Sequence, residues 1–129
     1  VQTCALPILA LFLSLGHHVA LVRRLSAAFE ERRKRIFGAI NTYLPDWRST
    51  DPAGGSSLWL EGPHGANTRY IAEAAARRGV IIEPGERFFD AREKPTRFMR
   101  LGISSIGQQH IESGVRELAN SIERRAVAA

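Results

Sequence analysis

The stretch Phe98-Met99-Arg100-Leu101-Gly102-Ile103-Ser104-Ser105 decides how the rest of the chain is interpreted. Its apolar residues, followed by small polar ones, predict a short buried strand. Arg100 does not fit this pattern, because a guanidinium keeps its charge and a buried charge needs a partner. Its planar fork suits a carboxylate, which it can hold with two parallel hydrogen bonds. Arg100 is therefore half of an internal ion pair, an exposed residue at a sheet edge, or an anchor for an acidic ligand.

The composition indicates one globular domain. The chain has 129 residues, of which 44% are hydrophobic and 24% charged, so it can form a core and is not typical of disorder. The net charge of +5 permits an anionic partner without requiring one. A single cysteine excludes a disulfide framework within the chain and favours a reducing, cytoplasmic setting. The apolar run from Leu6 to Leu15 is too short for a membrane-spanning helix, so we expect no membrane partner.

The first residues do not look native. The octapeptide from Val1 to Ile8 looks like the translated end of a sequencing-library adapter fused to a truncated reading frame, and the chain lacks an initial methionine. We therefore expect residues 1–8 to be non-native. We expect residues 9–46 to form a helical region and residues 47–129 to form the α/β domain.

The spacing of apolar residues predicts helices on both sides of the organising strand. A short helix covers residues 9–15, and a long one covers residues 17–44. A further helix follows Asn67, a plausible N-cap, and ends at Gly79. The last helix follows Gly107 and carries its apolar residues on one face.

Three segments predict strands. They are residues 57–61, 80–82 and 98–105, and in the first of them Leu58 and Leu60 lie on the face opposite Trp59. Strands and helices then follow one another in an order typical of an α/β domain. We expect a small two-layer sandwich, a short mixed β-sheet with helices packed on it, preceded by the long helix.

No complete catalytic motif is present. The sequence has no nucleophile elbow, no phosphate loop and no cysteine–histidine pair at a telling spacing. The adjacent His17 and His18 lack the spacing of paired metal ligands, so no metal site is expected. The basic run 32–35 is balanced by two glutamates and lacks interleaved aromatic residues, which favours a solvated helix face over a nucleic-acid surface. Glu83 and Glu86 flank a turn, and nothing marks them as an acid–base pair.

Several phrases nevertheless occur in an order that resembles a known family. They are Gly54-Gly55-Ser56-Ser57-Leu58-Trp59-Leu60, Ala74-Ala75-Ala76-Arg77-Arg78-Gly79-Val80-Ile81-Ile82-Glu83-Pro84-Gly85, Phe88-Phe89 and Met99-Arg100-Leu101-Gly102-Ile103-Ser104. Together they resemble the C-terminal small domain of fold-type I pyridoxal-phosphate proteins, the class I/II aminotransferases. The helix phrases Arg23-Arg24-Leu25 and Phe29-Glu30-Glu31-Arg32-Arg33 look most like the MocR subgroup of GntR regulators. In that subgroup an aminotransferase-like domain is joined to an N-terminal winged helix-turn-helix.

The resemblance implies roles for a few residues. Arg100 matches the arginine that binds the α-carboxylate of the amino-acid substrate or effector. Gly54 and Gly55 match a loop on the substrate side, and Gly85 matches a turn that faces the large domain. We expect no catalytic and no cofactor-binding residue in this chain, because the family's lysine and the aspartate that pairs with the cofactor belong to the large domain.

The resemblance also implies a longer protein. The only lysines, Lys34 and Lys94, do not match the family's lysine motif, so pyridoxal 5'-phosphate would be bound mainly by the missing large domain. We expect the effector-carboxylate-binding part of a MocR/GntR regulator, which binds DNA through an absent N-terminal domain. The alternative is a fragment of a class I/II aminotransferase acting between an amino acid and a 2-oxo acid. Either full-length protein is expected to be a homodimer, whereas a free-standing basic binding module has only the net charge in its favour.

Overall fold

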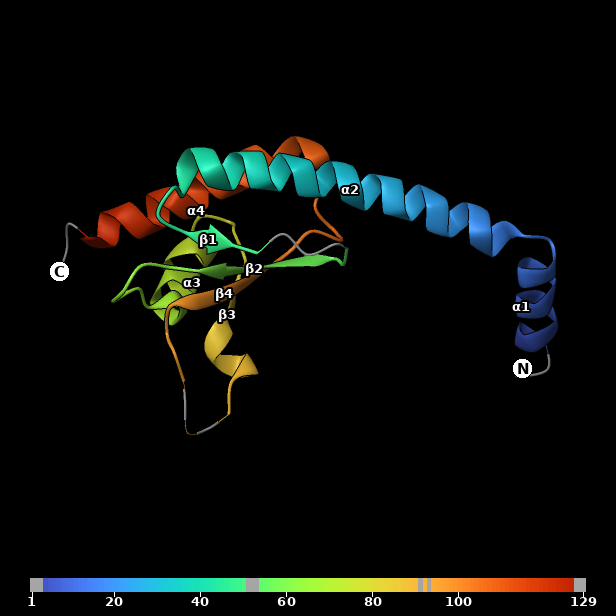
Figure 1. Cartoon of the computed structure of the whole chain (residues 1–129), viewed down its shortest axis with the longest axis horizontal. Coiled ribbons are helices and arrows are strands. Elements are labelled where there is room, and N and C mark those ends of the chain that lie inside the picture. The colour runs from blue at the N-terminus through green and yellow to red at the C-terminus, as the bar shows by residue number, and fades with distance from the viewer. Residues whose placement is uncertain (1–3, 51–53, 91, 93, 127–129) are drawn as a thin grey trace.

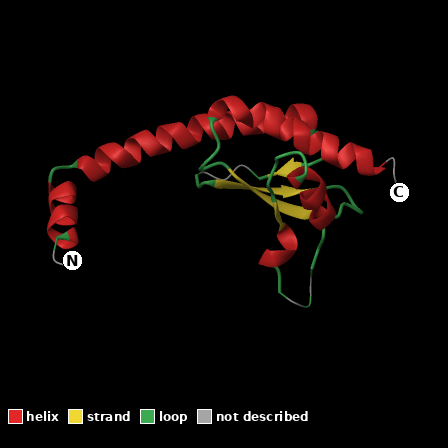
Figure 2. Cartoon of the chain, turned by 180° about the vertical axis from the view of Figure 1, so that it is seen from behind, coloured by secondary structure: helices red, strands yellow, loops and turns green. Residues whose placement is uncertain are grey.

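A four-stranded sheet with helices packed on one face forms the body of the chain, and a long helix extends away from it (Figure 1). The computed structural model describes residues 4–50, 54–90, 92 and 94–126, with side chains described as far as Glu123. Figure 2 shows the same arrangement from behind, with the strands below the paired long helices. This confirms the α/β class that the sequence predicts.

Two helices lead into the domain. Helix α1 (Ala5–Ser14) and helix α2 (His17–Tyr43) are separated by Gly16, whose φ of +75° lies in the left-handed region that glycine tolerates. The buried residues of α2 all lie near its C-terminal end, where the helix packs beside α4 (Ile111–Ala126): Ile36, Ala39 and Ile40. The long helix predicted for residues 17–44 is therefore confirmed.

Among the described residues, no single helix is long and apolar enough to cross a membrane. The pair α1 and α2, which are bent by 74° at their junction, meets that criterion of length and composition only when the two helices are taken together.

All the strand pairings of the sheet are antiparallel, so the mixed sheet expected from the sequence is wrong. The strands lie in the order β1-β2-β4-β3, and they comprise β1 (Arg48–Ser49), β2 (Ser57–Glu61), β4 (Phe98–Gly102) and β3 (Glu83–Pro84). The outer strands have two residues each. The ladder between β2 and β4 is therefore the main element of the sheet.

The core lies between one face of this ladder and the helices. Helix α3 (Thr68–Ala76) contributes Ile71 and Ala75, and α4 contributes Ile111 and Leu118. The buried hydroxyl of Thr68 donates a hydrogen bond of 2.8 Å to the carbonyl oxygen of Phe98, which fixes the start of α3 against β4. The predicted N-cap is also confirmed, because the Asn67 side chain accepts a hydrogen bond from the backbone of Tyr70.

Two short segments differ from the expectation. The three β-branched residues 80–82 form no strand, and Ile81 is 88% exposed, because the chain pairs with β4 only from Glu83 onward. The sequence does not predict strand β1, because it has two residues and adjoins a stretch rich in turn residues. Residues 51–53 of the loop that follows lie outside the described part of the chain.

Gly85 generates a prediction about the packing of the short 3-10 helix η1 (Gly85–Phe88) on β4. A Cβ at Gly85 would lie 2.5 Å from the carbonyl oxygen of Phe98, whereas a Cβ at Gly54 would meet no atom within 4 Å. We expect Gly85→Ala to lower the free energy of unfolding by about 1–3 kcal/mol, as overpacking does. The control Gly54→Ala should change it by less than about 0.5 kcal/mol. Urea denaturation followed by circular dichroism measures both, and equal stabilities would contradict the close packing.

Exposed apolar side chains on α1 and the N-terminal part of α2 generate a second prediction. These large side chains are 38–73% exposed: Leu6, Ile8, Leu9, Leu11, Leu13, Leu15, Val19, Leu21, Val22 and Leu25. Because large apolar patches favour association, we expect this chain to self-associate as its concentration rises. Sedimentation velocity should show this, and Leu9→Glu with Leu13→Glu should reduce it, whereas Ile81→Glu on the sheet domain should not. A monomer at all concentrations with a sharply cooperative melt would contradict the prediction.

Candidate functional site

The candidate site is built around Arg100 in the middle of β4. Side chains alternate along this strand, so Met99 and Leu101 are buried against the helices while Phe98 and Arg100 lie on the opposite face. The Arg100 side chain is 42% exposed. The prediction of a buried strand therefore holds for alternate residues only, because helices cover one face of the sheet and leave the other open.

Arg100 is paired with a carboxylate of its own chain. Glu83 lies directly opposite it in the β3–β4 register, and the Arg100 Nε donates a hydrogen bond to the Glu83 Oε2. This hydrogen bond is the main cause that lowers the pKa of Glu83 and raises the pKa of Arg100. Of the three roles that the sequence left open for Arg100, the structure shows the internal ion pair. A guanidinium has five N–H donors, so a bond from Nε is compatible with a second carboxylate on the same group.

Four rings pack on one another beside Arg100 on the open face, and we call them the aromatic cluster: Trp59, Phe88, Phe89 and Phe98. Trp59 lies opposite Arg100 in the β2–β4 register and stacks on Phe98, with ring centroids 5.8 Å apart. Its ring centroid lies 5.6 Å from that of Phe88 in an edge-on arrangement. The Arg100 Cζ lies 5.1 Å from the centroid of the Phe88 ring, within the range of a cation–π contact.

Of the glycines singled out in the sequence, Gly85 packs against Phe98 of this cluster, whereas Gly54 and Gly55 lie apart from it. Gly54 and Gly55 are exposed and precede β2, and Gly55 has a φ of +102°. In the β2–β4 register, Ser57 pairs with Gly102, so the two glycines lie beyond the end of the ladder whose middle holds Arg100. Among the described residues, no group of three histidine, cysteine, aspartate or glutamate side chains is placed to hold a metal ion.

Among the described residues, neither lysine has surroundings that fit the cofactor-bonding lysine of a pyridoxal-phosphate site. Lys34 is 68% exposed on α2, and its amine lies 3.4 Å from a carboxylate oxygen of Glu30. Lys94 is exposed in the loop before β4. A lysine that bonds the cofactor is normally activated by desolvation in an enclosed pocket, and neither of these amines has such surroundings.

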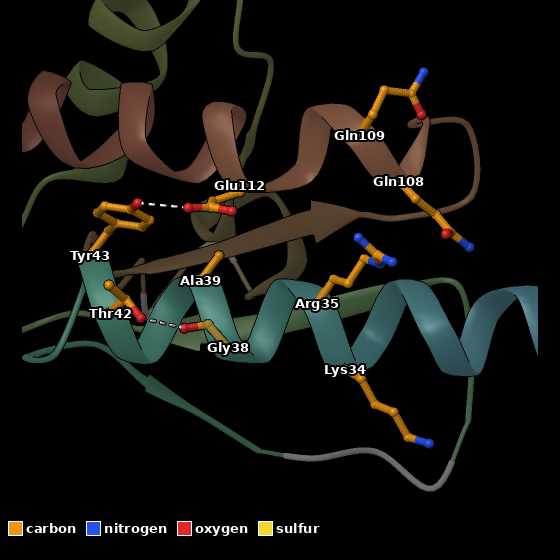
Figure 3. Close-up of a pocket in the computed structure, with 9 residues that line it drawn as sticks. All are labelled: Lys34, Arg35, Gly38, Ala39, Thr42, Tyr43, Gln108, Gln109 and Glu112. Carbon is orange, nitrogen blue, oxygen red and sulfur yellow. Dashed lines mark hydrogen bonds between the residues drawn. The ribbon is translucent and has the colours of Figure 1, made fainter.

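A crevice of about 400 Å³ lies between α2 and the start of α4, and Arg100 is not among the residues that line it (Figure 3). The Tyr43 hydroxyl donates a hydrogen bond of 2.9 Å to Glu112, and this bond is the main cause that raises the pKa of Tyr43. In Figure 3 the Lys34 side chain points away from Glu112. Arg35 is paired with Glu31 at 2.9 Å. Lys34, Arg35 and Glu112 of this crevice each have a partner within the chain, as Arg100 has, so pairing alone does not distinguish the two regions. We place the candidate site at Arg100 because its guanidinium lies beside the rings of the aromatic cluster.

Sequence reasoning identified Arg100 but not its neighbours. The sequence predicts a strand at residues 80–82 and leaves Glu83 beside a turn, whereas the strand is Glu83–Pro84. The position of Trp59 beside Arg100 could have been predicted from the alternation of side chains along the two strands. The alternation of β2 and of β4 puts Trp59 and Arg100 on the faces opposite their buried residues, and antiparallel pairing of the two strands would have brought them together.

The ion pair generates a prediction about pH. The pKa of Glu83 lies below its ordinary value of 4.5, so its carboxylate stabilises the fold above that value, and this contribution is lost as pH falls through the folded-state pKa. We expect Glu83→Gln to lower the melting temperature modestly at neutral pH, because both partners are partly exposed. The difference from the unchanged chain should shrink once the pH falls below about 4.5.

Differential scanning fluorimetry across a pH series measures this difference. In an Arg100→Gln background, Glu83→Gln should produce no comparable pH-dependent change. A melting-temperature difference between the single variant and the unchanged chain that stays constant down to the lowest pH would argue against the pairing.

The chain matches none of the established protein-family models. Among curated proteins it is similar to the HTH-type transcriptional regulator TauR of Rhodobacter capsulatus, with 40% identity over 114 residues, which make up 88% of this chain and 24% of the regulator. It is also similar to aromatic-amino-acid aminotransferase 1 of Thermococcus litoralis, with 32% identity over 96 residues, or 74% of this chain and 23% of the enzyme. The chain thus spans about a quarter of the length of these relatives.

Solved structures give the same result for the fold. The multiple substrate aminotransferase from Thermococcus profundus superposes with a TM-score of 0.81 and 28% identity, covering 92% of this chain and 29% of the enzyme chain. The kynurenine aminotransferase of Pyrococcus horikoshii gives a TM-score of 0.75 and 27% identity, covering 87% of this chain and 27% of that one. The chain therefore has the fold of the aminotransferase small domain and belongs with the pyridoxal-phosphate aminotransferases and the GntR-type regulators of the MocR subgroup that share it.

Proposed function

We propose that this chain is the effector-binding part of a MocR/GntR-type transcriptional regulator, in which Arg100 binds the carboxylate of an amino acid or a related ligand. The main support for the proposal is the position of Arg100. Its guanidinium lies in the middle of the β2–β4 ladder, on the face of the sheet that the helices leave open. The 40% identity with a GntR-type regulator over 88% of the chain supports the choice of regulator.

The described residues would bind and orient a ligand without reacting with it. Arg100 offers N–H donors to a carboxylate, and β4 holds its backbone in place through the ladders to β2 and β3. Glu83 holds the guanidinium on the strand while the ligand is absent. Pyridoxal phosphate, bound in the full-length protein, supplies the electron-accepting ring of this family's chemistry.

The second candidate is a fragment of a class I/II aminotransferase that moves an amino group between an amino acid and a 2-oxo acid. It is favoured by the 32% identity with an aromatic-amino-acid aminotransferase and by the aminotransferase fold. Sequencing the gene upstream distinguishes the two candidates. A winged-helix segment ahead of the large domain supports a regulator that binds DNA, whereas a short N-terminal arm supports an enzyme. We propose a homodimer in both cases.

The isolated chain should bind pyridoxal phosphate weakly and catalyse nothing. The reason is that Lys34 and Lys94 are exposed amines without an enclosing pocket. An absorbance titration of the isolated chain with pyridoxal phosphate should show no stoichiometric change of the cofactor spectrum, and Lys34→Arg with Lys94→Arg should leave the titration unaltered. A one-to-one spectral change that the double variant abolishes would contradict the prediction.

The carboxylate role of Arg100 is tested in the full-length protein. We expect Arg100→Ala to weaken amino-acid binding on the order of tenfold or more, and to change cofactor binding little, because a charge-assisted contact to the ligand is lost. Arg78→Ala is a matched control, since Arg78 also pairs with a glutamate, Glu117, but lies between α3 and α4. Isothermal titration calorimetry measures both variants. Equal amino-acid affinity in the unchanged protein and in Arg100→Ala would remove the case for this role.

A further inference from the structure

We propose that the ligand bound at Arg100 carries an aromatic or other large apolar group, which packs against the aromatic cluster beside the guanidinium. This inference rests on the proposed function, because it takes Arg100 as the residue that binds the ligand's carboxylate. It goes further by naming the class of ligand.

The first argument is the place of the rings in the sheet. The hydrophobic core lies on the other face of the β2–β4 ladder, where Leu58, Leu60 and Met99 are almost completely buried. The rings of the aromatic cluster therefore add nothing to that core. They pack on one another and remain partly exposed, and Phe88 is 51% exposed. Aromatic side chains beside a small number of polar groups are the typical lining of a small-molecule site.

The second argument is the contact between the rings and the charge. The Arg100 Cζ lies 5.1 Å from the centroid of Phe88, and Trp59 is the direct cross-strand neighbour of Arg100. A carboxylate held by the guanidinium therefore brings the rest of its molecule next to these rings. An aromatic group placed there gains contact area and edge-to-face or stacked ring contacts, whereas a methyl group leaves the rings exposed to water.

The test uses the full-length protein and three probes that share an α-carboxylate: L-phenylalanine, L-alanine and L-aspartate. Calorimetric titration should give the tightest binding for L-phenylalanine, on the order of tenfold tighter than for L-alanine. Phe88→Ala should reduce the ratio of the L-phenylalanine affinity to the L-alanine affinity by several-fold, because the ring that the phenyl group would contact is lost. Phe88→Leu keeps an apolar side chain without the ring and should give an intermediate ratio. Tyr70→Ala truncates a comparably exposed ring on α3 and should leave the ratio unchanged.

The outcomes separate this inference from the proposed function. If Arg100→Ala weakens binding of every probe while Phe88→Ala leaves the ratio unchanged, the carboxylate role stands and the aromatic preference is overturned. The aromatic preference is also overturned if the unchanged protein binds L-alanine or L-aspartate as tightly as L-phenylalanine. That result would mean that another part of the protein covers the aromatic cluster. If no probe binds, or if Arg100→Ala has no effect on any of them, both proposals fail.

Discussion

The antiparallel ladder between β2 and β4 is the constraint on which the rest of the structure depends. Its register places Leu58 opposite Leu101 and Leu60 opposite Met99, and all four residues are buried under the helices. The same register places Trp59 opposite Arg100 on the other face. A shift of one residue would move the charged side chain into the core and the apolar ones into water, so core packing and site geometry are fixed together.

Much of this could be predicted from the sequence, because the long and strongly patterned elements follow local rules. Helix α2, strand β2, the N-cap Asn67 and the left-handed turn at Gly79 appear where residue types and spacing indicate. What the sequence could not provide was the pairing of short segments. Residues 80–82 are β-branched, yet strand formation there needs a partner in register, and β4 offers one only to Glu83 and Pro84.

That error in strand placement explains why the surroundings of Arg100 were only partly predicted. An arginine inside an apolar strand indicates that a carboxylate is near, but sequence distance does not say which one. Glu83 is 17 residues away and reaches Arg100 through the β3–β4 pairing. The basic run 32–35 was also only partly predictable from the sequence. Lys34 and Arg35 are exposed as expected, but the Arg32 guanidinium donates a hydrogen bond of 3.0 Å to the carbonyl oxygen of Ser104, which is distant in the sequence.

The contact of Arg32 with Ser104 joins the long helix to the segment that follows β4. Helix α2 has 27 residues, so it is a rod of roughly 40 Å, and its buried residues lie near one end. Because the packed residues lie near one end of this rod, any tilt of α2 about them would displace the other end, at Gly16, much farther than the residues beside Ser104.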